Sequence, residues 1–273
     1  MNDYTIFGDR ERTGWATDSI VDAYISSFSQ VVDNTFPHHL AAISAPSHVL
    51  DLCCGQGTLT AEIAKHGHSV TGLDFSKAML NIARSKSPEI EFLEGDAQAL
   101  PFADNSFDAV TCNFGIMHIP DQDKALSEVT RVLKPNGLFS MTAWMGPDVS
   151  AAFRMVFSHA RAALPEGATP PPAPDFFLYA RPDDASQKLK NAGLEVTSHA
   201  QLPLAWNIEE PEQLFQGFLH GTVAARMLLM TLDDTTRESV GQAIAKDVEE
   251  GFATQDGYTV PAPVAHIVAK PNA

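Results

Sequence analysis

A glycine-containing turn and two acidic residues at the ends of apolar runs are the parts of this sequence best suited to bind a ligand. Residues 49–54 form an apolar run that leads through Gly55 and Gly57 into a short helical stretch at 59–65. Glycine has no Cβ and tolerates positive φ, so the backbone of such a turn can approach a ligand closely. The helix N-terminus behind it favours an anionic group. Taken alone, the turn could also be an ordinary connection between a strand and a helix.

The two acids end the next two β-rich runs. Asp74, nineteen residues after Gly55, ends the second run, and Asp96 ends the third. An acid in the first position can accept hydrogen bonds from both hydroxyls of a ribose. Asp96 could accept from an adenine amino group while the backbone N–H of Ala97 reaches a ring nitrogen. Either acid could instead cap a helix or form a turn. Together, at three consecutive strand ends, these residues indicate one crevice for an adenosine-containing cofactor.

The elements that would position these residues alternate along the chain. β-rich runs separated by amphipathic stretches predict a parallel sheet with crossover helices. We expect strands at residues 48–54, 69–75, 90–96, 107–114, 137–143, 194–201 and 262–269. We expect helices within 19–43 and at 59–65, 183–192, 211–230 and 233–250, with Ser76 and either Asp121 or Asp123 capping two more.

These elements predict an α/β fold with a Rossmann-like, seven-stranded, mostly parallel sheet. We assign residues 1–47 to an N-terminal helical cover and 48–146 to the Rossmann-like core. Residues 147–273 would hold the remainder of the sheet and a helical substrate cap at about 202–257, inserted before the last strand. The proline-rich run 165–174 must be extended, as a surface linker or the edge of a lid.

Charge and composition exclude several classes of partner. Among 273 residues, 34 acids and 18 bases give a formal net charge of −16, which repels nucleic acid and anionic membranes. No apolar run is long enough for a membrane span, and the polar start lacks a secretory signal, so we expect a cytoplasmic protein. The three cysteines, Cys53, Cys54 and Cys112, indicate small buried side chains, with neither a disulfide framework nor a metal site.

Residues 48–143 resemble the core of the class I S-adenosylmethionine (SAM)-dependent methyltransferases. Residues 51–57 are similar to the first motif of that family, with Cys53 where an opening glycine often stands. Asp74 and Asp96 match its ribose-binding and adenine-binding acids. Residues 133–137 match the turn before its fifth strand, although Leu138 follows the glycine. Residues 100–108 are especially similar to the subgroup that acts in ubiquinone and menaquinone biosynthesis.

The resemblance implies SAM as the cofactor and a set of residues that contacts it. These residues lie on the first turn and at the ends of the next three strands: Asp51, Cys53, Gly55, Gly57, Asp74, Phe75, Met79, Asp96, Ala97, Asn113 and Phe114. Asn113 and Phe114 would lie near the sulfonium, where the substrate also binds. His118, a few residues further, is the nearest candidate for a general base, or it forms a hydrogen bond that holds its loop.

The substrate half of the chain is less informative. His159, His199, His220 and Tyr179 are further candidates for a base. An apolar pocket could be lined by aromatic residues that could equally be core: Trp144, Phe153, Phe157, Phe176, Phe177, Tyr179, Trp206, Phe215 and Phe218. We expect methylation of a small, partly apolar metabolite at O, N or C; the sequence names neither the metabolite nor the oligomeric state.

Two other functions stay open at this point. A nicotinamide-dependent oxidoreductase would also place an acid after the second strand, but its third glycine is replaced by Thr60. A non-catalytic SAM-binding regulator would bind the cofactor without a substrate cavity.

Overall fold

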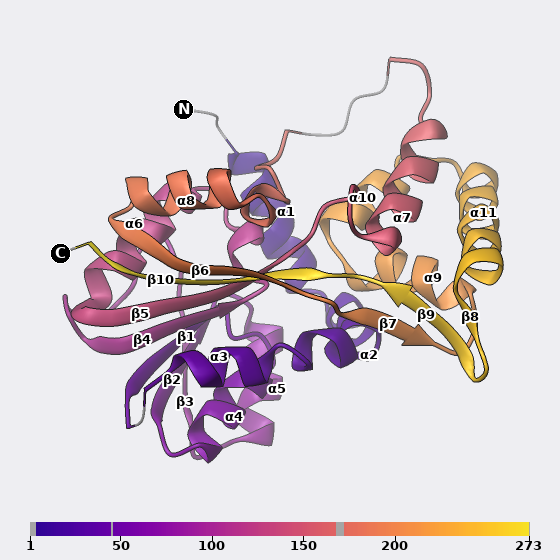
Figure 1. Ribbon diagram of the computed structural model, residues 1–273. Coiled ribbons are helices and arrows are strands. Elements are labelled where there is room, and N and C mark those ends of the chain that lie inside the picture. Colours follow the sequence, from indigo (N-terminus) through magenta and orange to yellow (C-terminus); the bar gives the residue numbers. More distant parts are fainter. Residues whose placement is uncertain (1–3, 45, 168–171, 273) are drawn as a thin grey trace.

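A seven-stranded sheet is the centre of the molecule (Figure 1), in a computed structural model that describes residues 4–44, 46–167 and 172–272. The strand order is β3-β2-β1-β4-β5-β10-β6. The bounds are β1 His48–Leu52, β2 Ser69–Asp74, β3 Glu91–Glu94, β4 Phe107–Asn113, β5 Leu133–Trp144, β6 Leu194–Leu202 and β10 Val264–Pro271. The pairs from β3 to β5 are parallel. Only β10 runs antiparallel, against both β5 and β6. The predicted Rossmann-like sheet is confirmed.

Helices cover both faces of this sheet. In Figure 1, α3 (Phe36–Ala42), α4 (Thr58–Lys65) and α5 (Lys77–Lys86) lie below it, and α6 (Gln122–Val132) and α8 (Pro182–Asn191) lie above it. Because both faces are covered, central strands such as β1 and β4 are buried along most of their length. The caps follow the sequence: Ser76 accepts from the Met79 N–H at the start of α5, and Asp121 accepts from the Lys124 N–H at the start of α6.

The N-terminal segment contains one more helix than the sequence patterns indicated. Helices α2 (Asp18–Asp33) and α3 occupy the predicted helical region, and α1 (Thr5–Trp15) precedes them. Phe7, Glu11 and Trp15 recur at intervals of four residues and are buried. One face of this polar helix therefore packs on the rest of the molecule.

The segment between β6 and β10 is not wholly helical. It begins with β7 (Ala205–Ile208), continues through α9 (Glu212–Gly221), α10 (Ala224–Leu229) and α11 (Asp234–Phe252), and ends with β8 (Ala253–Thr254) and β9 (Gly257–Pro261). The three short strands form a separate antiparallel sheet in the order β7-β9-β8. Helix α7 (Ala151–Ala162) packs against α11, beside this small sheet.

The predicted single helix over residues 211–230 is wrong. The chain leaves the helix at Thr222, whose φ of −130° and ψ of 159° are extended, and resumes it at Ala224. The break lies where Gly221 meets α2: a Cβ there would be 2.9 Å from the backbone nitrogen of Tyr24. Within the expected extended run 165–174, residues 168–171 lie outside the described part of the chain.

Candidate functional site

The turn after β1 has an unusual backbone conformation. Cys53, Gly55 and Gly57 all have positive φ, at 57°, 53° and 76°. A Cβ on Gly57 would lie 2.8 Å from the Phe92 ring and 2.9 Å from Ala83. Glycine is therefore needed at residue 57 for both its conformation and its close packing, and the turn brings its backbone to the carboxyl edge of the sheet.

Asp74 lies beside this turn at the end of β2. Its two carboxylate oxygens accept from the backbone N–H groups of Gly55, at 2.9 Å, and Ser76, at 2.8 Å. Burial raises the pKa of Asp74, while the hydrogen bonds from Ser76 and Gly55 act in the opposite direction. The carboxylate is held in a fixed orientation and keeps lone pairs for a ligand.

Asp96 follows β3 and forms an ion pair with a helix that the sequence did not associate with it. The Arg12 guanidinium on α1 donates to Asp96 at 2.6 Å and lies 5.6 Å from the centre of the Phe75 ring. Burial alone would raise the pKa of Asp96, but hydrogen bonds from Gln98 and Arg12 hold it below its ordinary value. The carboxylate is therefore ionised and ready to accept hydrogen bonds.

Most of the predicted cofactor residues line two adjoining cavities of about 20 and 80 Å³. The two cavities share Cys53, Asp74, Phe75, His118 and Ile119, so they form one crevice. Predicted residues that line the crevice are Cys53, Gly55, Asp74, Phe75, Met79, Asp96, Ala97, Asn113, Phe114 and His118.

Asp51 and Gly57 do not line the crevice. The Asp51 carboxylate is buried and accepts from the hydroxyls of Thr60, at 2.6 Å, and Thr111, at 2.7 Å. Burial raises its pKa to about 6, against the effect of the two hydroxyls. These contacts tie β1 to α4 and β4, so the structure places Asp51 behind the turn rather than against a ligand.

Asn113 and Phe114 form the floor of the larger part of the crevice. The Asn113 side-chain oxygen accepts from Thr35 at 2.9 Å, from Thr142, and from the ring of His39 at 3.2 Å. Phe114 has a φ of 54° and stacks on Trp144, with ring centres 4.2 Å apart. The Asn113 side chain is thus engaged by the protein, and its contribution to a ligand would come from its backbone.

The N-terminal helices close the crevice with residues that the sequence analysis did not select. Glu11 and Arg12 line its smaller part, and Trp15 and Tyr24 line its larger part. The four-residue spacing of Phe7, Glu11 and Trp15 was the available signal. That spacing predicts a buried helical face, but it does not indicate where the helix docks.

His118 and Glu11 meet inside the site. The His118 Nδ1 atom lies 2.8 Å from a Glu11 carboxylate oxygen, and the Trp15 indole N–H donates to the same oxygen at 2.9 Å. Glu11 is 1% exposed. The loop-holding hydrogen bond expected for His118 is present, and it also orients the imidazole ring.

A third cavity, of about 310 Å³, adjoins the crevice and is mostly aromatic. It shares Trp15, Tyr24 and His118 with the larger part of the crevice. Six of the nine aromatic residues proposed for a pocket line it: Trp144, Phe153, Phe157, Phe176, Phe177 and Phe218. The other three, Tyr179, Trp206 and Phe215, do not.

The other candidate bases lie away from this cavity. His159 pairs with Asp247 at 2.7 Å, and His199 contacts the Tyr179 carbonyl oxygen at 2.9 Å. Tyr179 is buried, and its hydroxyl donates a hydrogen bond to the side-chain oxygen of Gln122. His220 lines a different groove, between α2 and α9. The described residues contain no group of three or more potential metal ligands.

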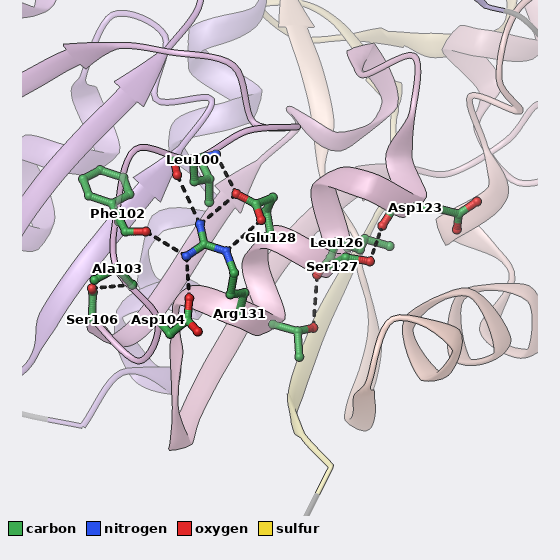
Figure 2. Close-up of polar contacts among 11 residues, drawn as sticks. Leu100, Phe102, Ala103, Asp104, Ser106, Asp123, Leu126, Ser127, Glu128 and Arg131 are labelled. Atoms are coloured by element: carbon green, nitrogen blue, oxygen red, sulfur yellow. Dashed lines mark hydrogen bonds and ion pairs between the residues drawn. The ribbon is translucent and has the colours of Figure 1, made fainter.

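Arg131 holds residues 100–108 in place, the stretch that resembles the ubiquinone and menaquinone subgroup (Figure 2). Its guanidinium donates to the carbonyl oxygens of Leu100, at 3.1 Å, and Phe102, at 2.8 Å, and also pairs with Glu128 and Asp104. Glu128 in turn accepts from the Leu100 N–H at 2.7 Å. This stretch is therefore anchored to α6, which holds the connection that leaves Asp96 and Ala97.

Comparison with known proteins agrees with this geometry. Residues 50–141 match the family model described as a methyltransferase domain. The chain is 44% identical over 110 residues to the demethylmenaquinone methyltransferase of Renibacterium salmoninarum, covering 40% of this chain and 46% of that protein. It is 40% identical over 132 residues to the enzyme of the same name from Paenarthrobacter aurescens, covering 48% and 52%. The match thus spans about half the length of these curated relatives.

Solved structures resemble the chain over most of its length. The 1,6-didemethyltoxoflavin-N1-methyltransferase of Burkholderia thailandensis, solved with S-adenosylhomocysteine, has a TM-score of 0.59 at 13% identity, covering 100% of this chain and 92% of that one. The cyclase SpnF also has a TM-score of 0.59, at 18% identity, covering 96% and 97%. These likenesses show the fold. No helix in the described part of the chain is long and apolar enough to cross a membrane.

Proposed function

We propose, on the premise that residues 50–141 are a methyltransferase domain, that the whole chain transfers a methyl group from SAM to O, N or C of a small, partly apolar molecule. The observation that carries the proposal is the crevice. It combines the turn at Cys53 and Gly55 with Asp74, Asp96 and Ala97, and it opens toward an aromatic cavity. The net charge of −16 favours a small molecule over nucleic acid, and we expect the enzyme to act in the cytoplasm.

The residues of the crevice fit an adenosyl cofactor in kind and position. Asp74 would hold the ribose hydroxyls, Asp96 and Ala97 the adenine, and the turn at Cys53 and Gly55 the amino-acid part. The two parts of the crevice enclose only about 20 and 80 Å³, less than the roughly 300 Å³ of a typical ligand pocket. The Arg12 side chain, which is 49% exposed, would therefore turn away from Asp96 when the cofactor binds, while Glu11 on the same helix stays against His118.

The contribution of the chain to the reaction is mainly alignment. The bound cofactor supplies a methyl group on a positively charged sulfur. The protein holds the acceptor in line with that group, and such positioning can lower the barrier by ~7–11 kcal/mol. Trp15 and Tyr24 close the crevice and exclude water, and the aromatic cavity holds the acceptor. On this proposal residues 1–47 act as a cover, and the cap at about 202–257 encloses the substrate side.

Titration calorimetry with SAM and with S-adenosylhomocysteine tests the proposal. The wild-type protein should bind both, and Asp74→Asn should weaken binding by about 1.5–3 kcal/mol because a charge-assisted hydrogen bond to the ribose is lost. Glu94→Gln is the matched control. Glu94 ends the neighbouring strand β3 but is exposed and lies outside the crevice, so its affinity should not change. A wild-type protein that binds NADH but neither SAM nor S-adenosylhomocysteine would overturn the proposal.

A further inference from the structure

His118 lies where all three cavities of the site meet. It lines both parts of the crevice and also the aromatic cavity. Its side chain is 19% exposed, and its ring meets the edges of Trp15 and Phe176, with centres 5.5 and 5.8 Å apart. A group bound in the aromatic cavity and directed at the crevice must pass this imidazole.

Glu11 gives this histidine the arrangement of a base. Nδ1 of His118 is occupied by the Glu11 carboxylate at 2.8 Å. Among the described residues, no hydrogen-bond partner of Nε2 occurs. A carboxylate on one ring nitrogen holds the proton there and leaves the other nitrogen as a proton acceptor. It also stabilises the imidazolium that forms when that proton is taken up.

The second oxygen of Glu11 strengthens this assignment. Its Oε1 atom is buried and has no hydrogen-bond partner among the described residues, while Oε2 accepts from both His118 and Trp15. A buried carboxylate with one unsatisfied oxygen is costly unless a positive charge forms beside it. Asp74, Asp96 and Arg12 are the other charged groups that line this part of the crevice with His118. The His118 ring, held by the Glu11 carboxylate, is thus placed to receive a proton.

The walls of the neighbouring cavity indicate what kind of molecule gives up that proton. Ten of its 19 described lining residues are Phe, Tyr or Trp. Aromatic walls favour a flat aromatic ring through stacked and edge-to-face contacts, and about 310 Å³ is room for one or two fused rings. A neutral amine needs no base before it attacks, whereas a hydroxyl must lose its proton.

We infer that the acceptor is a phenol, that His118 is the catalytic base which takes its hydroxyl proton, and that Glu11 is a positioning residue for His118. This inference rests on the proposed function. The O–H proton passes to His118 Nε2, and the acceptor oxygen forms a bond to the methyl carbon. The electron pair of the broken sulfur–carbon bond stays on sulfur, which becomes a neutral thioether. The proton then leaves His118 for solvent.

Binding of 4-nitrophenol to the protein saturated with S-adenosylhomocysteine tests this inference without turnover. The phenolate of this probe is yellow and the phenol is nearly colourless, so absorbance reports which form is bound. Below the pKa of the free probe, the wild-type protein should bind it as the phenolate, paired with the His118 imidazolium. Both His118→Gln and Glu11→Gln should lose the yellow form, and His118→Gln should weaken binding roughly 10- to 100-fold.

His159→Gln is the matched control, because His159 also pairs with a carboxylate, at 2.7 Å, but lies outside the cavity. It should behave as the wild type. An unchanged circular dichroism spectrum and cooperative thermal unfolding show that a variant is folded, and S-adenosylhomocysteine is kept at a saturating concentration for each variant. If one of the two variants does not fold, the other still tests the inference. Failure of the wild type to bind S-adenosylhomocysteine overturns the proposed function. Cofactor binding with no probe bound, with the probe bound as the phenol, or with the yellow form kept in His118→Gln overturns this inference alone. A yellow form kept only in Glu11→Gln removes the role of Glu11.

Discussion

Asp51 and Asp74 are both buried carboxylates near the carboxyl edge of the sheet, yet only Asp74 reaches the crevice. The difference arises from their partners. Asp51 lies within β1, opposite Thr111 of β4, and its oxygens are taken by two hydroxyls. Asp74 ends β2, and its partners are backbone N–H groups of the binding turn. Sequence spacing puts both acids near the end of a strand, but it does not show which carboxylate is already satisfied by neighbouring side chains.

The buried charge of Asp51 predicts a pH-dependent cost in stability. Because the pKa of Asp51 is raised from 3.8 to about 6, the folded state binds more protons than the unfolded state between these values. The contribution of Asp51 to the free energy of unfolding therefore falls as the pH rises from about 4 to about 6 and is level above that. Asp51→Asn removes this cost, so its stability relative to the wild type should rise by up to about 3 kcal/mol between pH 4 and pH 7. Urea denaturation across that range measures the difference. If the difference in free energy of unfolding between variant and wild type does not change with pH, the folded protein stabilises the charge of Asp51 fully.

Helices α2 and α9 illustrate how packing between elements overrides a local pattern. Apolar periodicity continues through residues 211–230 and predicts one helix, but the structure breaks it after Gly221. At the break α9 meets another helix, and the backbone of Ala23 and Tyr24 occupies the space beside Gly221. The sequence patterns also did not predict the strands β7, β8 and β9. They have only two to five residues and pair mainly with one another, so alternation is too short to detect.

Gly221→Ala should separate α9 from α2. The new Cβ would lie 2.9–3.0 Å from backbone atoms of Ala23 and Tyr24, which cannot rotate away as a side chain can. We expect a loss of roughly 1–3 kcal/mol in the free energy of unfolding, measured by chemical denaturation. Gly251→Ala is the control. Nothing lies within 4 Å of its Cβ position near the end of α11, so it should be neutral or stabilising by up to about 1 kcal/mol. Equal effects of the two substitutions would show that helix propensity, not the contact, decides the result.

In the whole molecule, the order of the strands predicts which residues line the cofactor crevice. It does not predict that α1 closes this crevice. A parallel sheet brings the ends of β1, β2 and β3 to one edge, so ten of twelve predicted site residues line the crevice. Glu11 and Arg12 reach the same place from the start of the chain, and Arg12 is 84 residues from its partner Asp96. No local spacing encodes such a contact, because it depends on where α1 docks.

This arrangement predicts that cofactor binding protects both the sheet edge and the N-terminal helices. A ligand that binds only the folded state at 100 times its Kd stabilises it by about 2.7 kcal/mol. Because α1 and α2 contribute Trp15 and Tyr24 to the crevice, S-adenosylhomocysteine should slow hydrogen exchange in residues 5–33 as well as in 53–57, by up to about 100-fold. Strands β7 and β9 line neither part of the crevice and should change least, which makes them the internal control. Protection of residues 53–57 with unchanged exchange in residues 5–15 would contradict closure by α1, because the cofactor would then bind without stabilising this helix.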